Sequence, residues 1–78
     1  MLNVVGIEKL YDRESRSFIG VRLHCMGENP DVEGLAVEGI YCRDGYVDYS
    51  NVRLGDNIVP VYRYNKLQGF QVLPTKAE

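Results

Sequence analysis

The sequence predicts a small all-β protein, a five-stranded barrel, and three observations support this fold class. Residues 52–73 alternate turn-forming residues with runs of β-branched and aromatic residues, which is the pattern of turn, strand, turn, strand. Residues 18–26 alternate between two faces with the period of a half-buried strand. Residues 48–54 have room for one helical turn but not for an ordinary helix. A length of 78 residues allows one domain, so we assign residues 1–78 to a single unit.

Three strands are expected in the first half of the chain. Residues 2–11 are β-branched and apolar at irregular spacing, which favours a strand that contains a bulge. A wholly polar loop over 12–17 precedes the second strand, 18–26. The connection 27–34 has Asn, Pro and Asp at its centre, and it leads to a third strand over 35–42. The second and third strands therefore form a hairpin.

The register of this hairpin can be predicted from its apolar residues. A pairing that gathers them on one face sets Val21, Leu23 and Cys25 against Tyr41, Gly39 and Val37. Arg22 and His24 then lie on the other face, opposite or diagonal to Glu38 and Ile40, where a cross-strand ion pair contributes about 0.2 to 1 kcal/mol.

The second half predicts an irregular bridge followed by a terminal hairpin. The bridge covers 43–55 and contains the tight turn Asp44-Gly45. Strands are expected over 58–64 and 70–73, joined by a reversal over 65–69. Five strands with an irregular bridge between the third and fourth are typical of a Greek-key barrel of the OB type, with an SH3-like barrel as the alternative. Gly20 and Gly39, inside strands, indicate a bend in the backbone or close packing against a neighbouring sheet.

Composition bounds the class of protein. A hydrophobic content of 45% with 26% charged residues is ordinary for a folded soluble protein, and only residues 74–78 are expected to be frayed. The longest uncharged apolar run, 58–62, is far shorter than a membrane span, and the N-terminus lacks a signal pattern, so we predict a cytoplasmic protein. A chain this short buries a thin core, which favours a homo-oligomer.

The charge is unevenly distributed. The net charge is −2, so the chain lacks the strongly basic character that is usual in proteins that bind phosphate backbones. Residues 1–22 carry a net +1, residues 23–48 a net −5 and residues 49–78 a net +2. A positive face must therefore be local.

Two groups of residues are candidates for binding nucleic acid. Arg13 and Arg16 in the first loop, with Phe18, Arg22 and His24 on the outward face of the second strand, occupy the places that an OB barrel presents to a polynucleotide. Tyr62, Tyr64 and Lys66 near the last turn form an aromatic and basic tip, and bases stack on such rings. Solvated strand faces explain the same pattern, since tyrosine is also a common strand residue.

The sequence offers little for catalysis or metal binding. The predicted register sets Cys25 and Cys42 on opposite faces of the hairpin, so both are expected to be free thiols. One histidine and no Cys-x-x-Cys pair argue against zinc, and we predict no metal and no cofactor. No nucleophile elbow, paired-acid arrangement or phosphate-binding glycine loop is present, so we predict that the protein is not an enzyme.

Four segments carry a resemblance to a known family. They are Val4–Ile7, Gly20–Leu23, Gly55–Tyr62 and Gly69–Leu73. In their order the chain resembles OB-fold single-stranded DNA-binding proteins of bacteriophages, and more specifically the short proteins of phages and conjugative elements of Gram-positive bacteria. The closing stretch, residues 71–76, is similar to the C-terminal strand of the gene-five protein family of filamentous phages. The resemblance covers most of the chain and implies non-catalytic binding of single-stranded nucleic acid.

The leading hypothesis from the sequence is therefore an accessory protein of a phage or mobile genetic element that binds single-stranded nucleic acid as an oligomer. The alternative is a module for protein interaction or self-assembly, which exposed sheet edges or the tyrosine-rich surface would mediate and which binds no nucleic acid.

Overall fold

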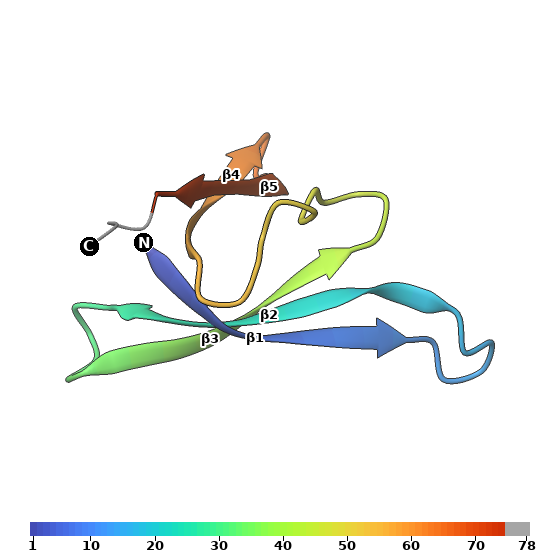
Figure 1. Cartoon of the computed structure of the whole chain (residues 1–78), viewed down its shortest axis with the longest axis horizontal. Helices are drawn as coiled ribbons and strands as arrows, with labels where there is room; N and C mark the ends of the chain where they lie inside the picture. Colours follow the sequence, from blue (N-terminus) through green and yellow to red (C-terminus); the bar gives the residue numbers. More distant parts are fainter. Residues whose placement is uncertain (75–78) are drawn as a thin grey trace.

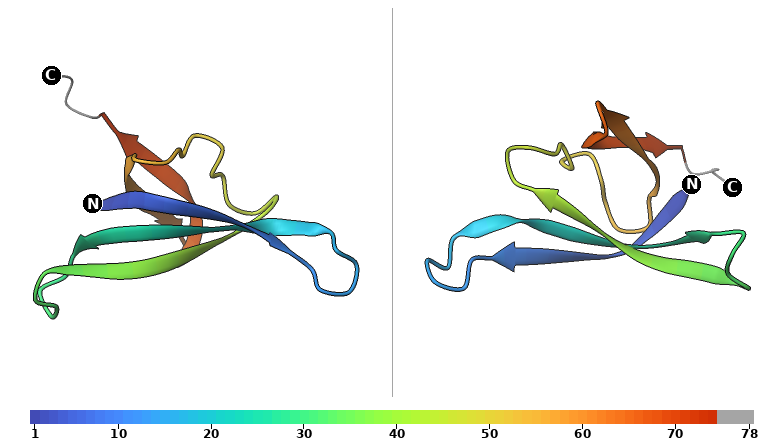
Figure 2. Two further views of the ribbon diagram at one scale, coloured as in Figure 1. Left: turned by 60° about the horizontal axis from the view of Figure 1, so that its bottom comes forward. Right: turned by 180° about the vertical axis from the view of Figure 1, so that it is seen from behind.

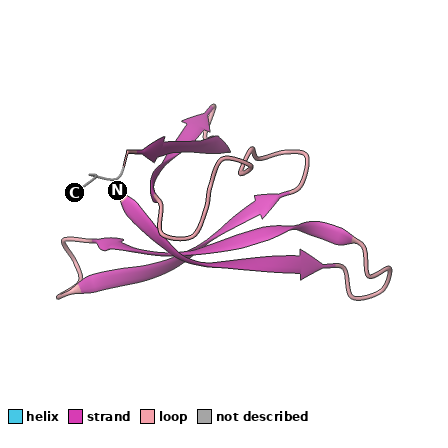
Figure 3. Cartoon of the chain, viewed as in Figure 1, coloured by secondary structure: helices cyan, strands magenta, loops and turns pink. Residues whose placement is uncertain are grey.

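The computed structural model describes residues 1–74 and confirms the all-β prediction (Figures 1 and 3). Its five antiparallel strands form one sheet; they are β1 (Leu2–Tyr11), β2 (Phe18–Glu28), β3 (Leu35–Arg43), β4 (Asn57–Arg63) and β5 (Lys66–Leu73). Over the same residues, no helix has the length and apolar character needed to cross a membrane. The predicted frayed end, 74–78, lies outside the described residues apart from Pro74.

The strands follow a Greek-key order. The sheet order is β3-β2-β1-β4-β5, so three consecutive strands form a meander and β4 returns through the connection 44–56 to lie beside β1. The β1–β4 pairing is short and joins Leu2 to Ile58 and Asn3 to Asn57. The hairpin of β4 and β5 is folded over one face of the meander (Figures 1 and 2). The Greek-key arrangement predicted from the sequence is thus confirmed.

The sheet does not close into the predicted barrel. The strands β3 and β5 stand at its two ends, and among the described residues they are not paired with each other. The connection explains this, because it occupies the edge of β5 that β3 would need. The Asp48 backbone amide donates to the Gln68 carbonyl at 2.9 Å, and the Asn51 side-chain amide donates to the Phe70 carbonyl at 3.1 Å. The connection therefore takes the place of a β3–β5 ladder.

The core lies between the meander and the folded hairpin. Its buried residues are Val4, Val21, Leu23, Cys25, Cys42, Val52, Ile58 and Phe70. This list confirms the inward face predicted for the second strand. We call the opposite surface of the meander, which looks away from β4 and β5, the outer face; its central residues are Glu8, Arg22, His24, Gly39 and Tyr41.

The predicted register of the β2–β3 hairpin was wrong by one residue. Leu23 pairs with Ile40 and Val21 with Cys42, and this arrangement buries Cys42 and packs Ile40 against the core. A slip of one residue moves every side chain of β3 to the other face. As a result Tyr41 lies on the outer face opposite Arg22, and Glu38, predicted to be near Arg22 and His24, lies on the inner side.

Irregularities in the pairing bend the meander. The bulge predicted in residues 2–11 is confirmed at Val5, and the β1–β2 register shifts again at Ile19. Gly20, with φ +155°, pairs next to this second shift, and a Cβ there would lie 2.2 Å from the Cys42 carbonyl oxygen. Gly39 differs, because the three atoms nearest to a Cβ there all belong to the flexible Arg22 side chain, with Cδ at 3.0 Å. Close approach of the β3 backbone therefore requires glycine only at position 20.

The terminal hairpin is tighter than predicted. Its turn is Tyr64-Asn65, and positive φ angles of 54° and 64° give these two residues the left-handed backbone of a two-residue hairpin loop. The strand β5 begins at Lys66, which had been placed in a longer reversal over 65–69. The predicted turn at Asp44-Gly45 is confirmed, with φ +85° at Gly45, and residues 48–54 form turns but no helical turn.

The two strand glycines provide a paired stability test. We expect Gly20→Ala to lower the free energy of unfolding by about 3 kcal/mol or more, because the new methyl group meets a backbone carbonyl that cannot move away. Gly39→Ala should cost about 1 kcal/mol or less, because the Arg22 side chain can rotate. Urea denaturation measures both, and equal losses would contradict this account of Gly20.

Candidate nucleic-acid interface

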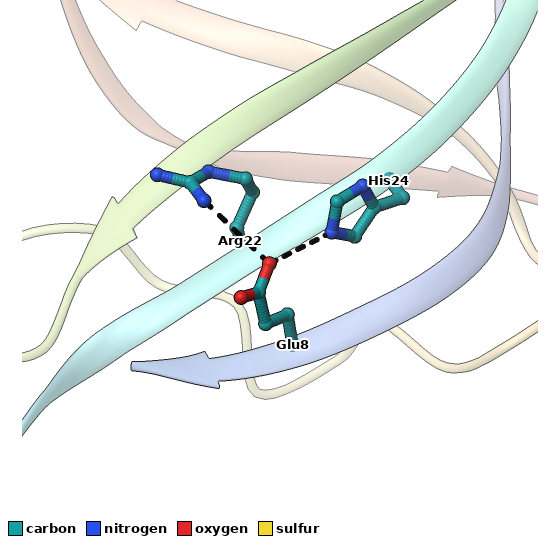
Figure 4. Close-up of polar contacts among 3 residues, drawn as sticks. All are labelled: Glu8, Arg22 and His24. Atoms are coloured by element: carbon teal, nitrogen blue, oxygen red, sulfur yellow. Dashed lines mark hydrogen bonds and ion pairs between the residues drawn. The ribbon is translucent and has the colours of Figure 1, made fainter. Parts of the chain in front are cut away.

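An ion cluster stands at the centre of the outer face. Glu8 of β1 pairs with Arg22 of β2, and its Oε1 atom is 3.5 Å from Arg22 Nη1 and 2.9 Å from His24 Nε2 (Figure 4). All three side chains are about half exposed. One carboxylate therefore faces two basic groups, where the sequence had predicted Glu38 as their acidic neighbour.

The hydrogen bond from His24 Nε2 is the main reason that the pKa of Glu8 lies below its ordinary value of 4.5, and the positive charge of Arg22 lowers it further. Glu8 is therefore ionised at neutral pH, and it offsets part of the positive charge of the cluster. An incoming phosphate would compete with this carboxylate for the same donors.

Glycines on both sides let the basic side chains lie against the sheet. The Arg22 side chain covers Gly39 of β3, and the His24 side chain covers Gly6 of β1, where a Cβ would lie 3.4 Å from His24 Cβ. Tyr41 is directly opposite Arg22 and is 46% exposed. The result is a low strip of guanidinium, imidazole and phenol groups across β2 and β3, flanked by Gly6 of β1.

The strip continues toward the end of β3. Arg43 pairs with Gly20, and its guanidinium carbon lies 4.3 Å from the centre of the Tyr46 ring, within the range of a cation–π contact. Tyr46 is largely exposed. Arg43 and Tyr46 thus place a second cation with an aromatic partner beside Tyr41 along the strand.

The first loop holds its two arginines at the surface. The Asp12 carboxylate accepts hydrogen bonds from the Ser15 backbone amide and hydroxyl, which lower the pKa of Asp12 and fix the turn. Arg13 and Arg16 project from this turn and are exposed. Phe18 packs edge-to-face on Tyr11 with 5.8 Å between ring centres. The bulge at Ile19 interrupts the alternation that had placed Phe18 on the same face as Arg22.

The tip of the last hairpin is a separate surface. Tyr62 and Tyr64 are 63% and 85% exposed, and the guanidinium carbon of Arg63 lies 5.6 Å from the Tyr64 ring centre. Lys66 is exposed next to them. This hairpin covers the inner side of the meander, so its tip does not join the outer face in one patch (Figure 2).

The predicted site residues thus fall into three groups. Arg22 and His24 lie together on the outer face, Arg13, Arg16 and Phe18 lie at the end of the first hairpin, and Tyr62, Tyr64 and Lys66 lie at the last tip. Glu8, Tyr41 and Arg43 were not predicted as neighbours of Arg22 and His24. For Tyr41 and Arg43 the signal was Cys42, since cysteine is among the most often buried residues and its burial sets both neighbours outward. No such signal marks Glu8, whose pairing with Arg22 follows the bulge at Val5.

The buried thiols lie apart from the candidate interface and belong to the core. Cys25 and Cys42 are free and buried, and burial raises the pKa of Cys42 to about 11. The register places both thiols on the inner side of the hairpin, so the prediction of opposite faces was wrong. Within residues 1–74, no three His, Cys, Asp or Glu side chains gather closely enough to hold a metal ion.

The structure also has a cavity away from the predicted site. It measures about 410 Å³ and is lined by Met1, Asn3, Met26, Gly27, Glu28, Leu35 and Asn57. None of the predicted binding residues lines it. This cavity is therefore not part of the candidate interface, whose central side chains are about half exposed.

No protein-family model, no curated protein and no solved structure matches this chain.

The ion cluster predicts that the pKa of Glu8 depends on His24. Carboxyl NMR should give Glu8 a pKa below 4.5, and His24→Ala should raise it toward that value. Because the folded-state pKa is lowered, the stability that Glu8 contributes is present above the ordinary pKa and is lost as the pH falls through the folded value. Lys9→Ala is the matched control, because Lys9 pairs with Val21 on the inner side. An unchanged Glu8 pKa in the His24 variant would refute the assigned cause.

Proposed function

We propose that this chain is a non-catalytic protein that binds single-stranded nucleic acid across the outer face of β1, β2 and β3. Phosphates would be held by Arg22 and Arg43, with Arg13 and Arg16 at one end, and a base would stack on Tyr41. Its assignment as an accessory protein of a phage or mobile genetic element rests on the sequence resemblance and is part of this proposal.

One observation carries the proposal: Arg22, His24 and Tyr41 are contiguous on a low exposed surface, with glycines on both sides. A single strand needs cations that follow its backbone and aromatic rings that meet its bases, and this strip provides both types of group. Glu38 is on the inner side, so Glu8 is the carboxylate that lies among these residues.

The net charge of −2 argues for modest affinity. Few phosphates would be neutralised, so the slope of log K against log salt should be shallow, about −0.7 for each phosphate contacted on a single strand. Binding through two or three arginines would then be measurable at low salt and weak at physiological salt. Association of several copies along a strand would raise the affinity.

Tyr41 tests the stacking step. Fluorescence anisotropy with labelled oligo-dT at low salt should show a loss of affinity of about 5- to 100-fold for Tyr41→Ala, because one base loses its stacking surface. Tyr41→Phe keeps the ring and should bind within about twofold of the wild type. Wild-type protein without salt-sensitive binding at micromolar concentration would remove the proposal, and equal affinity of both variants would remove the role of Tyr41.

Glu8 tests the electrostatic step. Glu8→Gln should bind oligo-dT more tightly by severalfold, because Arg22 and His24 are then free to meet phosphate. Glu38→Gln is the matched control, since it removes the same charge from the inner side of β3. Equal gains in the two variants would mean that only net charge matters and that the outer face is not the contact surface.

A further inference from the structure

The two end strands of the open sheet are protected very differently. The edge of β5 is covered by the connection through the hydrogen bonds of Asp48 and Asn51, and the β4–β5 pairing contains an irregularity. Within residues 1–74, no segment covers the edge of β3, and its one charge inside the strand is Glu38 on the inner side. This strand is nine residues long, it pairs with β2 without a register shift, and it contains no proline or lysine. Proteins normally block such an edge, because its unpaired backbone groups can pair with another strand.

The side chains of β3 on the outer face are also largely apolar. Leu35, Val37 and Tyr41 are 55%, 70% and 46% exposed, and they lie on one face of β3. Glu38, on the other face, and Arg43, at the end of the strand, are the charged residues of β3. A partner strand would stabilise an exposed strand of this kind, because it would pair with the backbone and cover these apolar side chains.

The backbone of β3 is oriented for such pairing. The Asp44 amide donates to the Ile19 carbonyl of β2 at 2.9 Å, whereas the Arg43 carbonyl turns away from β2 and accepts from the Tyr46 and Val47 amides. Backbone groups alternate sides along a strand. The amides and carbonyls of residues 37, 39 and 41 therefore lie in the plane of the sheet and point past its edge, away from β2.

We propose that the partner is a second copy of this chain, which pairs β3 with β3 in antiparallel orientation about a two-fold axis. With the axis at Gly39, Val37 of each copy faces Tyr41 of the other, which is a favourable β-branched and aromatic pair. In this register Glu38 faces Ile40 and not the second Glu38. The edge is thus complementary to itself.

The charges at the two ends of β3 favour the antiparallel orientation. The loop before β3 carries Asp31 and Glu33, and the end of β3 carries Arg43. Antiparallel pairing brings the acidic loop of each copy beside Arg43 of the other. Asp44 at the same end accepts a hydrogen bond from the Tyr49 hydroxyl at 3.0 Å, so its carboxylate already has a partner within the same chain.

The resulting dimer has one continuous sheet through both meanders, and the two outer faces lie on the same side of it. This inference goes beyond nucleic-acid binding and does not depend on it, because it follows from the edge strand alone. If both hold, the strip of Arg22 and Tyr41 is doubled across the two-fold axis.

The experiment is analytical ultracentrifugation of the full chain, without nucleic acid, from about 10 to 300 µM. Wild-type protein is expected to shift from the mass of one chain to that of two and no further. Val37→Pro should raise the dimer dissociation constant at least tenfold, because it removes an outward-facing amide and leaves the pairing with β2 intact. Val37→Thr, which keeps that amide, is the control and should dimerise within about threefold of the wild type.

Three results would overturn the proposal: a wild type that remains a single chain throughout, a folded Val37→Pro variant that dimerises as well as the wild type, or a mass that grows without limit through head-to-tail contacts. Should Val37→Pro not fold, amide hydrogen exchange of the wild type decides the question. The amides of Val37, Gly39 and Tyr41 must be better protected at high than at low protein concentration, and protection independent of concentration would refute the dimer.

Discussion

The burial of Cys42 and Ile40 against β2 is the constraint on which the rest of the surface depends. With these two side chains inward, the register places Leu23 opposite Ile40. The residues that alternate with them along β3, Gly39 and Tyr41 among them, must point outward. The core is small, so each inward position on the meander carries a large share of the hydrophobic stabilisation. A register in which Tyr41 packed inward would leave Cys42 exposed and would bring Glu38 to the outer face. The same apolar contact that stabilises the hairpin therefore determines which charges meet at its surface.

A second consequence of the small core is the open sheet. The connection between β3 and β4 bonds to β5 through Asp48 and Asn51, and it also supplies Val52 to the core. One segment thus covers the edge of β5 and also fills the interior. A direct β3–β5 ladder would cover the edge but would add no side chain from the connection to the core. Covering β5 in this way leaves β3, among residues 1–74, as the edge with unpaired backbone groups. The openness of the sheet and the availability of β3 have one cause.

Much of the fold was predictable because local chemistry determines it. The polar loop at 12–17, the glycine turn at 44–45 and the alternation of residues 21–26 are properties of neighbouring residues, and the structure confirms them. The hairpin register was not predictable in this way, because both pairings gather apolar residues on the inner face. One buries Ile40 and Cys42, and the other would bury Val37 and Tyr41. Closure of the barrel was also beyond local reasoning, since it depends on where residues 48–51 bond. The prediction of Glu38 as a neighbour of Arg22 was wrong because it relied on the wrong hairpin register. The placement of Phe18 depended on a bulge at Ile19 that alternation does not reveal.

The acidic composition is compatible with the proposed nucleic-acid interface, because the carboxylates and the arginines lie in different parts of the molecule. Between Leu23 and Cys42 the chain has no lysine or arginine, and its carboxylates lie on the loop before β3, at the end of β2 and on the inner side of β3. Exposed charges interact over about 8 Å at physiological ionic strength, so acids at the loop contribute little at the centre of the outer face and more at its end. Glu8 is the exception, because it is in direct contact with Arg22 and His24. A surface whose two basic groups share one carboxylate is held in a defined geometry while it is empty, and a ligand gains only the difference between its own contacts and those of Glu8. Binding to such a face is expected to be selective for ligands that also use the tyrosine, because charge alone gives an anion little advantage over the carboxylate already there.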